Sequence, residues 1–145
     1  MDKTYLLQTA ADLFPVSPSA ADEYKQQMDK MIHHVNEAFA LRPDTKTLIG
    51  PSNEQMMKDN HQNHARFMYS LFIHYDPEVF VSTVLWVFKS YCHHGFSSLY
   101  WAAQLNAWVD ALKMELSDAA YREILPYYFW MQVNIPIFTS LSSGE

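Results

Sequence analysis

Hydrophobic side chains recur along most of this chain at intervals of three or four residues, which places them on one face of an α-helix. Between residues 17 and 41, for example, Tyr24, Met31 and Val35 keep this spacing, with polar residues between them. The stretch 77–94 is apolar on several sides and is expected at the centre of the fold. The pattern predicts helices over residues 3–14, 17–41, 52–75, 77–94, 97–116 and 117–136.

Proline, glycine and capping residues mark the ends of these helices. The Asp-Pro-Glu run at 76–78 has the order of a helix start, with a capping carboxylate and then a proline in the first turn. Gly95 is expected to end the following helix. Residues 45–51, which finish in a Gly-Pro pair, are expected to form a loop. Pro126 falls inside the last predicted helix and is expected to kink or break it, because proline lacks the amide donor.

These elements predict one all-α domain over residues 1–145, built as a bundle of five to six helices. The chain has three glycines, fewer than the tight turns of a β-sandwich or barrel need. We expect residues 1–16 to form a short helix or an N-terminal arm, and residues 142–145 to form a frayed tail.

Charge and composition exclude several classes of partner. The formal net charge is −6 and the Lys and Arg residues are scattered, so nucleic acid is not expected to bind. No apolar run approaches the roughly 20 residues of a membrane span, and the first residues lack the pattern of a secretory signal. The single cysteine, Cys92, cannot form an internal disulfide. We therefore expect a cytoplasmic protein with no membrane partner.

Two histidines share a helix face with core residues. His61 and His64 follow the spacing of Met57 and Met68, so both are expected to point inward, about one turn apart. Neutral imidazole is a good metal ligand, and His94 is a third candidate ligand if its helix pairs antiparallel with theirs. The interpretation we favour is that His61 and His64 are hydrogen-bonded core side chains.

Haem is a second candidate cofactor, because a haem site needs an inward histidine and a large pocket with apolar and aromatic walls. Its axial ligand would be one of His61, His64, His74 and His94, among which the sequence does not choose. The sequence contains neither the Glu-x-x-His pairs of di-iron bundles nor the His-Glu-x-x-His helix of zinc proteases.

Aromatic residues make up 15% of the chain, and many are Tyr or Trp with a polar tip to satisfy. This content predicts either a pocket for a flat or apolar ligand, or a packed core with a dimer interface. The candidate ligand-binding residues are His61, His64, Met68, Tyr91, Tyr100, Trp101, Trp108 and Trp130.

Enzymatic activity is the weakest of the expectations. Cys92 and His93 are neighbours in sequence only, whereas a nucleophile and its base must meet in space. The chain has no Gly-x-Ser-x-Gly elbow, phosphate-binding loop or dinucleotide fingerprint. A small enzyme acting on an apolar substrate is thus the third interpretation.

The order of motifs in the second half of the chain resembles a class of known domains. The motifs are Asn60-His61-x-x-His64, Pro77-x-x-Phe80, Trp86-x4-Tyr91-x3-Gly95-Phe96, Trp108 and Leu116-Ser117. They resemble the helical sensory domains of bacterial signalling proteins, namely the globin-like modules of RsbR-type stressosome proteins and the helical domains beside cobalamin-binding modules. The resemblance implies a globin-like bundle that binds haem, another ligand or none.

The sequence therefore predicts a non-enzymatic sensory or regulatory domain, expected as a homodimer, that binds a small ligand or a signalling protein through an aromatic pocket. Filling the pocket would shift the packing of the helices. The second interpretation is a haem- or metal-binding helical protein that uses the inward histidines.

Overall fold

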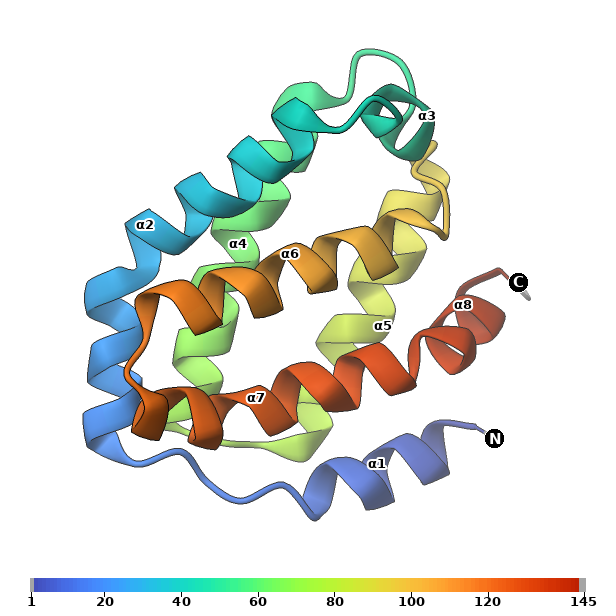
Figure 1. Ribbon diagram of the computed structural model, residues 1–145. Helices are drawn as coiled ribbons and strands as arrows, with labels where there is room; N and C mark the ends of the chain where they lie inside the picture. The colour runs from blue at the N-terminus through green and yellow to red at the C-terminus, as the bar shows by residue number, and fades with distance from the viewer. Residues whose placement is uncertain (1, 144–145) are drawn as a thin grey trace.

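The computed structural model describes residues 2–143, which fold into eight helices without a strand (Figure 1). The helices are α1 (Lys3–Ala11), α2 (Pro18–Leu41), α3 (Thr45–Ile49), α4 (Glu54–Ile73), α5 (Pro77–His93), α6 (Tyr100–Glu115), α7 (Asp118–Val133) and α8 (Ile135–Ser143). The predicted all-α class is confirmed. The predicted count of five to six helices is too low by two short helices, and the globin-like arrangement gains no support.

The first additional helix, α3, occupies the stretch predicted as a loop. It is a single turn of five residues, and it ends at Gly50, whose φ of 84° requires glycine. Leu48 and Ile49 are buried in this turn. The loop prediction was wrong because the packing of these two side chains outweighs the weak helix propensity of the segment. No local sequence pattern indicates this packing.

The second additional helix follows α7, which runs through Pro126 from Asp118 to Val133 without a break. Because Pro126 has no amide hydrogen, the backbone carbonyl of Arg122 loses its usual helical partner. Both residues are exposed, so water can satisfy that carbonyl. Of the predicted kink or break at Pro126, the break was therefore wrong. Helical structure also continues past residue 136 into α8, which includes the start of the predicted frayed tail; residues 144 and 145 lie outside the described part of the chain.

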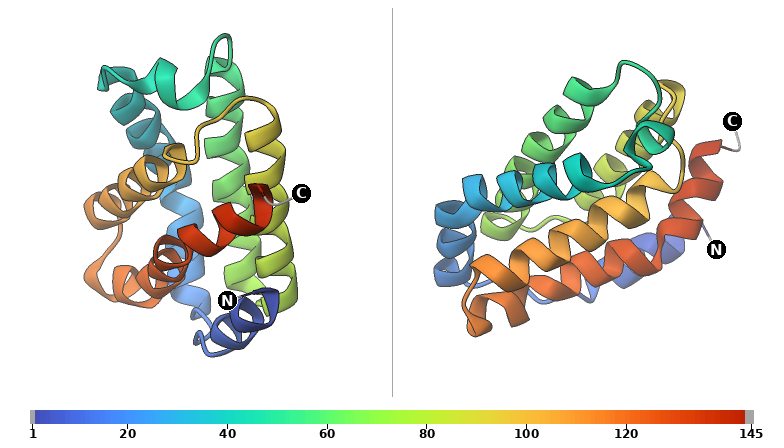
Figure 2. Two further views of the ribbon diagram at one scale, coloured as in Figure 1. Left: turned by 90° about the vertical axis from the view of Figure 1, so that its right-hand side faces the viewer. Right: turned by 45° about the horizontal axis from the view of Figure 1, so that its top comes forward.

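The packing of the helices leaves α4 and α5 with different partners, although a short turn joins them. The long helix α2 packs against α4, α6 and α7, whereas α5 packs mainly against α8 and α1 (Figures 1 and 2). Asp76 caps α5 through its carboxylate, as predicted, and accepts from the amides of Glu78 and Val79. The two helices meet near their connecting turn, where Phe67 of α4 contacts Phe80 of α5, and pack on different helices beyond it.

Two glutamates connect the N-terminal ends of α2 and α7, each binding the N-cap serine of the other helix. Ser17, the N-cap of α2, donates from its amide (2.7 Å) and its hydroxyl (3.0 Å) to the carboxylate of Glu123. In the same way Ser117, the N-cap of α7, donates from both groups to Glu23. A carboxylate is favoured at a helix N-terminus, where the amides point outward. These contacts fix α2 against α7 beside the buried tyrosines of the site described below.

The segment predicted as a short helix or arm packs on α5 as helix α1. Leu6 and Ala10 are fully buried. The indole of Trp130 donates to the Thr9 hydroxyl at 2.9 Å, and the Tyr75 hydroxyl donates to the Ala10 carbonyl at 2.7 Å. Residues 3–11 therefore belong to the core of the domain.

Candidate functional site

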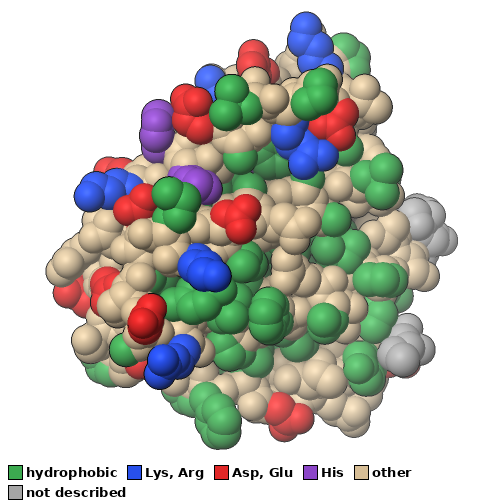
Figure 3. All heavy atoms as spheres, in the orientation of Figure 1, with side chains coloured by type: hydrophobic (Ala, Val, Ile, Leu, Met, Phe, Trp, Pro, Cys, Tyr) green, Lys and Arg blue, Asp and Glu red, His purple; other side chains and the backbone are tan. Residues whose placement is uncertain are grey.

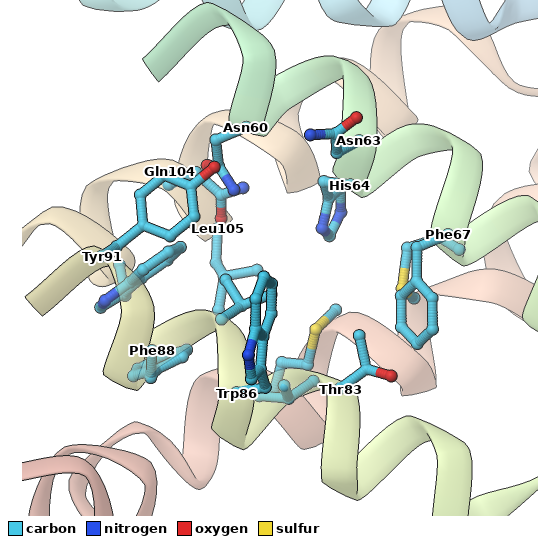
Figure 4. Close-up of a pocket in the computed structure, with 15 residues that line it drawn as sticks. Asn60, Asn63, His64, Phe67, Thr83, Trp86, Phe88, Tyr91, Gln104 and Leu105 are labelled. Atoms are coloured by element: carbon cyan, nitrogen blue, oxygen red, sulfur yellow. The ribbon is translucent and has the colours of Figure 1, made fainter. Parts of the chain in front are cut away.

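A pocket of about 270 Å³ lies between α4 and α5, and side chains of α6 and α7 also line it (Figure 4). Its apolar lining consists of Phe67, Met68, Val84, Trp86, Val87, Phe88, Tyr91, Trp101, Leu105 and Met131. The Trp86 side chain is 66% exposed and so stands at the mouth. A concave, mostly apolar space with a few polar groups is the usual form of a small-molecule site.

The polar lining of the pocket is uncharged. It consists of Asn60, Asn63, His64, Thr83 and Gln104, with no Asp, Glu, Lys or Arg among the described lining residues. Gln104 is 2% exposed. Within residues 2–143 its amide forms no hydrogen bond, and neither does the Thr83 hydroxyl. The Trp108 indole nitrogen is the only fully buried side-chain polar atom without a partner in residues 2–143, so the Gln104 amide keeps some access to the pocket, where it can bind a water or a ligand.

His64 reaches the pocket from α4 at the end of a chain of hydrogen bonds. Its Nε2 lies 2.9 Å from the hydroxyl of Tyr128, which lies 2.8 Å from the hydroxyl of Tyr24. The imidazole also packs against the indole of Trp108, with ring centroids 4.7 Å apart. The Nδ1 atom has no hydrogen-bond partner in the described part of the chain, and Figure 4 shows the ring directed into the pocket.

The three ionisable side chains of this hydrogen-bond chain, Tyr24, Tyr128 and His64, are held in their neutral forms. Burial lowers the pKa of His64 to about 3, and the nearby imidazole of His61 contributes to the decrease. Burial also raises the pKa of Tyr24 and of Tyr128 well above the usual value for a phenol. At neutral pH the chain therefore presents one neutral imidazole to the pocket.

His61 is a fully buried neighbour that does not line the pocket. Its Nδ1 lies 2.6 Å from Asn36 Oδ1, and its Nε2 lies 3.0 Å from the Tyr100 hydroxyl. That hydroxyl also donates to Asn60 Oδ1 at 2.8 Å, so its single proton has two acceptors within reach. Burial lowers the pKa of His61 to about 3. Both ring nitrogens are occupied, which is the arrangement of a hydrogen-bonded core histidine.

The histidines predicted as metal ligands are not grouped together in the described part of the chain. His94 is exposed at the end of α5, with Nδ1 2.8 Å from the Ser90 carbonyl. Among residues 2–143, no three His, Cys, Asp or Glu side chains are placed to hold a metal ion. His74 is exposed and His61 has no free nitrogen. The space beside His64, about 270 Å³, is far smaller than a haem, so these residues do not fit that cofactor.

The pocket contains half of the residues predicted to bind a ligand. The predicted residues that line it are His64, Met68, Tyr91 and Trp101. Tyr100 instead bonds His61, and Trp130 bonds Thr9 in α1. Trp108 packs behind His64, and its buried indole N–H has no partner in the described structure.

The most informative residue of the pocket, Gln104, was missed in the sequence. It lies on the face of α6 that carries Trp101 and Trp108, three residues after the first and four before the second. A glutamine on such an apolar face is a signal that could have been used. The α5 residues Thr83 and Trp86 carry no comparable signal, because they line a pocket only through the way α5 lies relative to α4.

No protein-family model, curated protein or solved structure matches this chain. No helix in residues 2–143 has the length and apolar character that crossing a membrane requires. The function is therefore argued from the geometry of the pocket alone.

Proposed function

We propose that this chain is a regulatory or sensory domain that binds a small, uncharged and mostly apolar molecule in the pocket between α4 and α5. The observation that carries the proposal is Gln104, a buried amide that faces an apolar pocket and has no partner in the described residues. In the empty protein only water in the pocket can satisfy such a group. A polar side chain in an apolar pocket is expected where the residue serves ligand binding rather than the stability of the fold.

The volume and charge of the pocket set the size and class of the ligand. A cavity of about 150 Å³ holds a benzene molecule. The present pocket, at about 270 Å³, therefore has room for a molecule of about ten non-hydrogen atoms. A charged ligand would lose its hydration without meeting an opposite charge, which is strongly unfavourable.

The position of the pocket supports a regulatory role. One wall belongs to α4, which packs on α2, and the other to α5, which packs on α1 and α8. A ligand that binds more tightly to one separation of α4 and α5 would shift the population toward that separation. Both terminal helices would move with α5, and through them the signal would reach a partner.

We also expect the protein to form a homodimer, as its aromatic content indicates. Hydrophobic side chains gather on the face formed by α6 and α7, between scattered charges (Figure 3). The α7 residues Phe129 and Val133 are 51% and 72% exposed. Sedimentation equilibrium at micromolar concentration tests this expectation, and a strictly monomeric protein would contradict it.

Binding is tested by saturation-transfer NMR with α-methylstyrene, an uncharged probe of the expected size. The wild-type protein should give a saturable signal. Val87→Phe adds a ring at the lining of the pocket and should weaken binding at least tenfold. Val133→Phe, the same substitution at an exposed position of α7, should bind like wild type. Equal binding by the two variants, or no saturable binding by the wild type, would refute the proposed function.

A further inference from the structure

The hydrogen-bond chain that ends at His64 has one favoured direction. The Tyr24 hydroxyl is fully buried, and the Tyr128 hydroxyl is its only partner in residues 2–143. If Tyr24 donates to Tyr128, then Tyr128 donates to Nε2 of His64, both hydroxyl protons are used, and the remaining imidazole proton belongs to a ring that lines the pocket, where water can accept it. In the opposite direction the Tyr24 proton has no acceptor, which costs on the order of 1–3 kcal/mol.

This direction fixes the tautomer of the imidazole. A neutral imidazole has one donor and one acceptor nitrogen. Because Nε2 of His64 accepts from Tyr128, the ring proton lies on Nδ1, which has no partner in residues 2–143, and the ring points into the pocket. Burial keeps the ring neutral at physiological pH, since the pKa of His64 is lowered to about 3. The pocket therefore contains one donor with a fixed position in an apolar wall.

From this geometry we infer that the pocket selects uncharged ligands with an accepting carbonyl oxygen, such as ketones, aldehydes and esters, which His64 Nδ1–H binds. The inference rests on the proposed function and adds the chemical class of the ligand. The Gln104 amide supplies a second polar contact, which can donate or accept and so does not itself decide the class. Phe67 and Met68, in the turn after His64, offer the apolar contact for the rest of the molecule.

The test compares three probes of nearly equal size and shape. Acetophenone has the carbonyl, α-methylstyrene replaces its oxygen with a CH₂ group, and benzoate carries a negative charge. A hydrogen bond in a buried site should favour acetophenone over α-methylstyrene by about three- to tenfold in Kd. Benzoate should bind at least tenfold more weakly than acetophenone. In His64→Leu the two uncharged probes should bind equally, with the Kd of α-methylstyrene within about threefold of wild type.

A second measurement does not depend on the folding of a variant. Long-range ¹H–¹⁵N NMR of the wild-type imidazoles assigns the protonated nitrogen of each ring. His64 should show the Nδ1–H form, and acetophenone should shift that nitrogen more than α-methylstyrene does. An Nε2–H form for His64 would overturn the inference.

The outcomes separate the inference from the function on which it rests. If no probe binds, the proposed function fails. Equal binding of acetophenone and α-methylstyrene by the wild type would overturn the inference and leave the pocket as an unselective apolar site. Tighter binding of benzoate would also overturn it, because the pocket would then prefer an anion.

Discussion

Tyr24 of α2 and Tyr128 of α7 meet through their hydroxyl groups at 2.8 Å, and both side chains are completely buried. Tyr128 has a second partner in the chain, His64 Nε2 at 2.9 Å, whereas Tyr24 has none. The contact therefore joins three helices, α2, α4 and α7, and it orients the imidazole that borders the pocket.

The two tyrosines should differ in their contribution to stability. Tyr128→Phe leaves two buried groups without a partner and should lower the free energy of unfolding by about 2–3 kcal/mol. Tyr24→Phe removes only the terminal donor and should cost about 1 kcal/mol. Tyr121→Phe, in the half-buried part of α7, is the control and should change little. Urea denaturation measures all three. A larger loss for Tyr24→Phe than for Tyr128→Phe would contradict the central position of Tyr128 between Tyr24 and His64.

Removal of the unpaired amide at Gln104 should stabilise the protein. Gln104→Met keeps the shape of the side chain and removes its polar end, so we expect the free energy of unfolding to rise by about 1 kcal/mol. The exposed Gln62 of α4 provides the control, and Gln62→Met should stay within about 0.5 kcal/mol of wild type. Thermal and urea unfolding measure both changes. If Gln104→Met were destabilising by more than 1 kcal/mol, the amide would have a partner in the native protein.

The sequence was informative wherever a regular pattern extends over several turns. The spacing of Met57, His61 and Met68 predicted the inner face of α4, and all three side chains are buried. The capping carboxylate of Asp76 and the positive φ of Gly95, 96°, are local features and were also predictable.

What the sequence could not supply depends on contacts between distant segments. Tyr100 and Tyr128, which bond the two inner histidines, lie 39 and 64 residues from them. The pocket arises because α4 and α5 pack on different helices, which no local spacing indicates. His64, Met68, Tyr91 and Trp101 were predicted from the sequence and line the pocket. Gln104, a polar residue on the apolar face of α6, carried a further signal of the site.

The protein should become less stable as the pH falls below neutral. Unfolded histidine has a pKa near 6.5, whereas burial lowers the pKa of His61 and of His64 to about 3. The unfolded chain thus binds protons in the window from 6.5 to 3 and the folded protein does not. The stability present above pH 6.5 is therefore lost as the pH decreases through this window. Between pH 7 and 5.5 the loss should be about 1 kcal/mol for His61 and less for His64, which borders the pocket.

Histidine variants and urea denaturation at several pH values provide the check of this dependence. His61→Gln should reduce the loss of stability between pH 7 and 5.5 by more than half. The exposed His33 serves as the matched position, and His33→Gln should leave the pH dependence unchanged. A wild-type stability that is constant over this interval would show that the inner imidazoles take up protons in the folded protein as they do in the unfolded chain.

Trp86 should contribute to binding but not to folding. Its side chain lines the pocket and is 66% exposed, so Trp86→Ala should weaken acetophenone binding at least fivefold while stability stays within about 0.5 kcal/mol. Phe129→Ala, at a half-exposed aromatic residue outside the pocket, should leave binding unchanged. NMR titration gives the two affinities. Equal affinities would mean that the ligand does not reach the mouth of the pocket.

The most direct measurement of the central claim is methionine-methyl NMR during a titration with acetophenone. Met68 and Met131 line the pocket, whereas Met31 and Met57 are buried elsewhere in the core. We predict that the methyl resonances of Met68 and Met131 shift saturably with one common Kd, and that those of Met31 and Met57 stay in place. Unchanged resonances at Met68 and Met131, or shifts of equal size at all four methionines, would contradict a ligand site between α4 and α5.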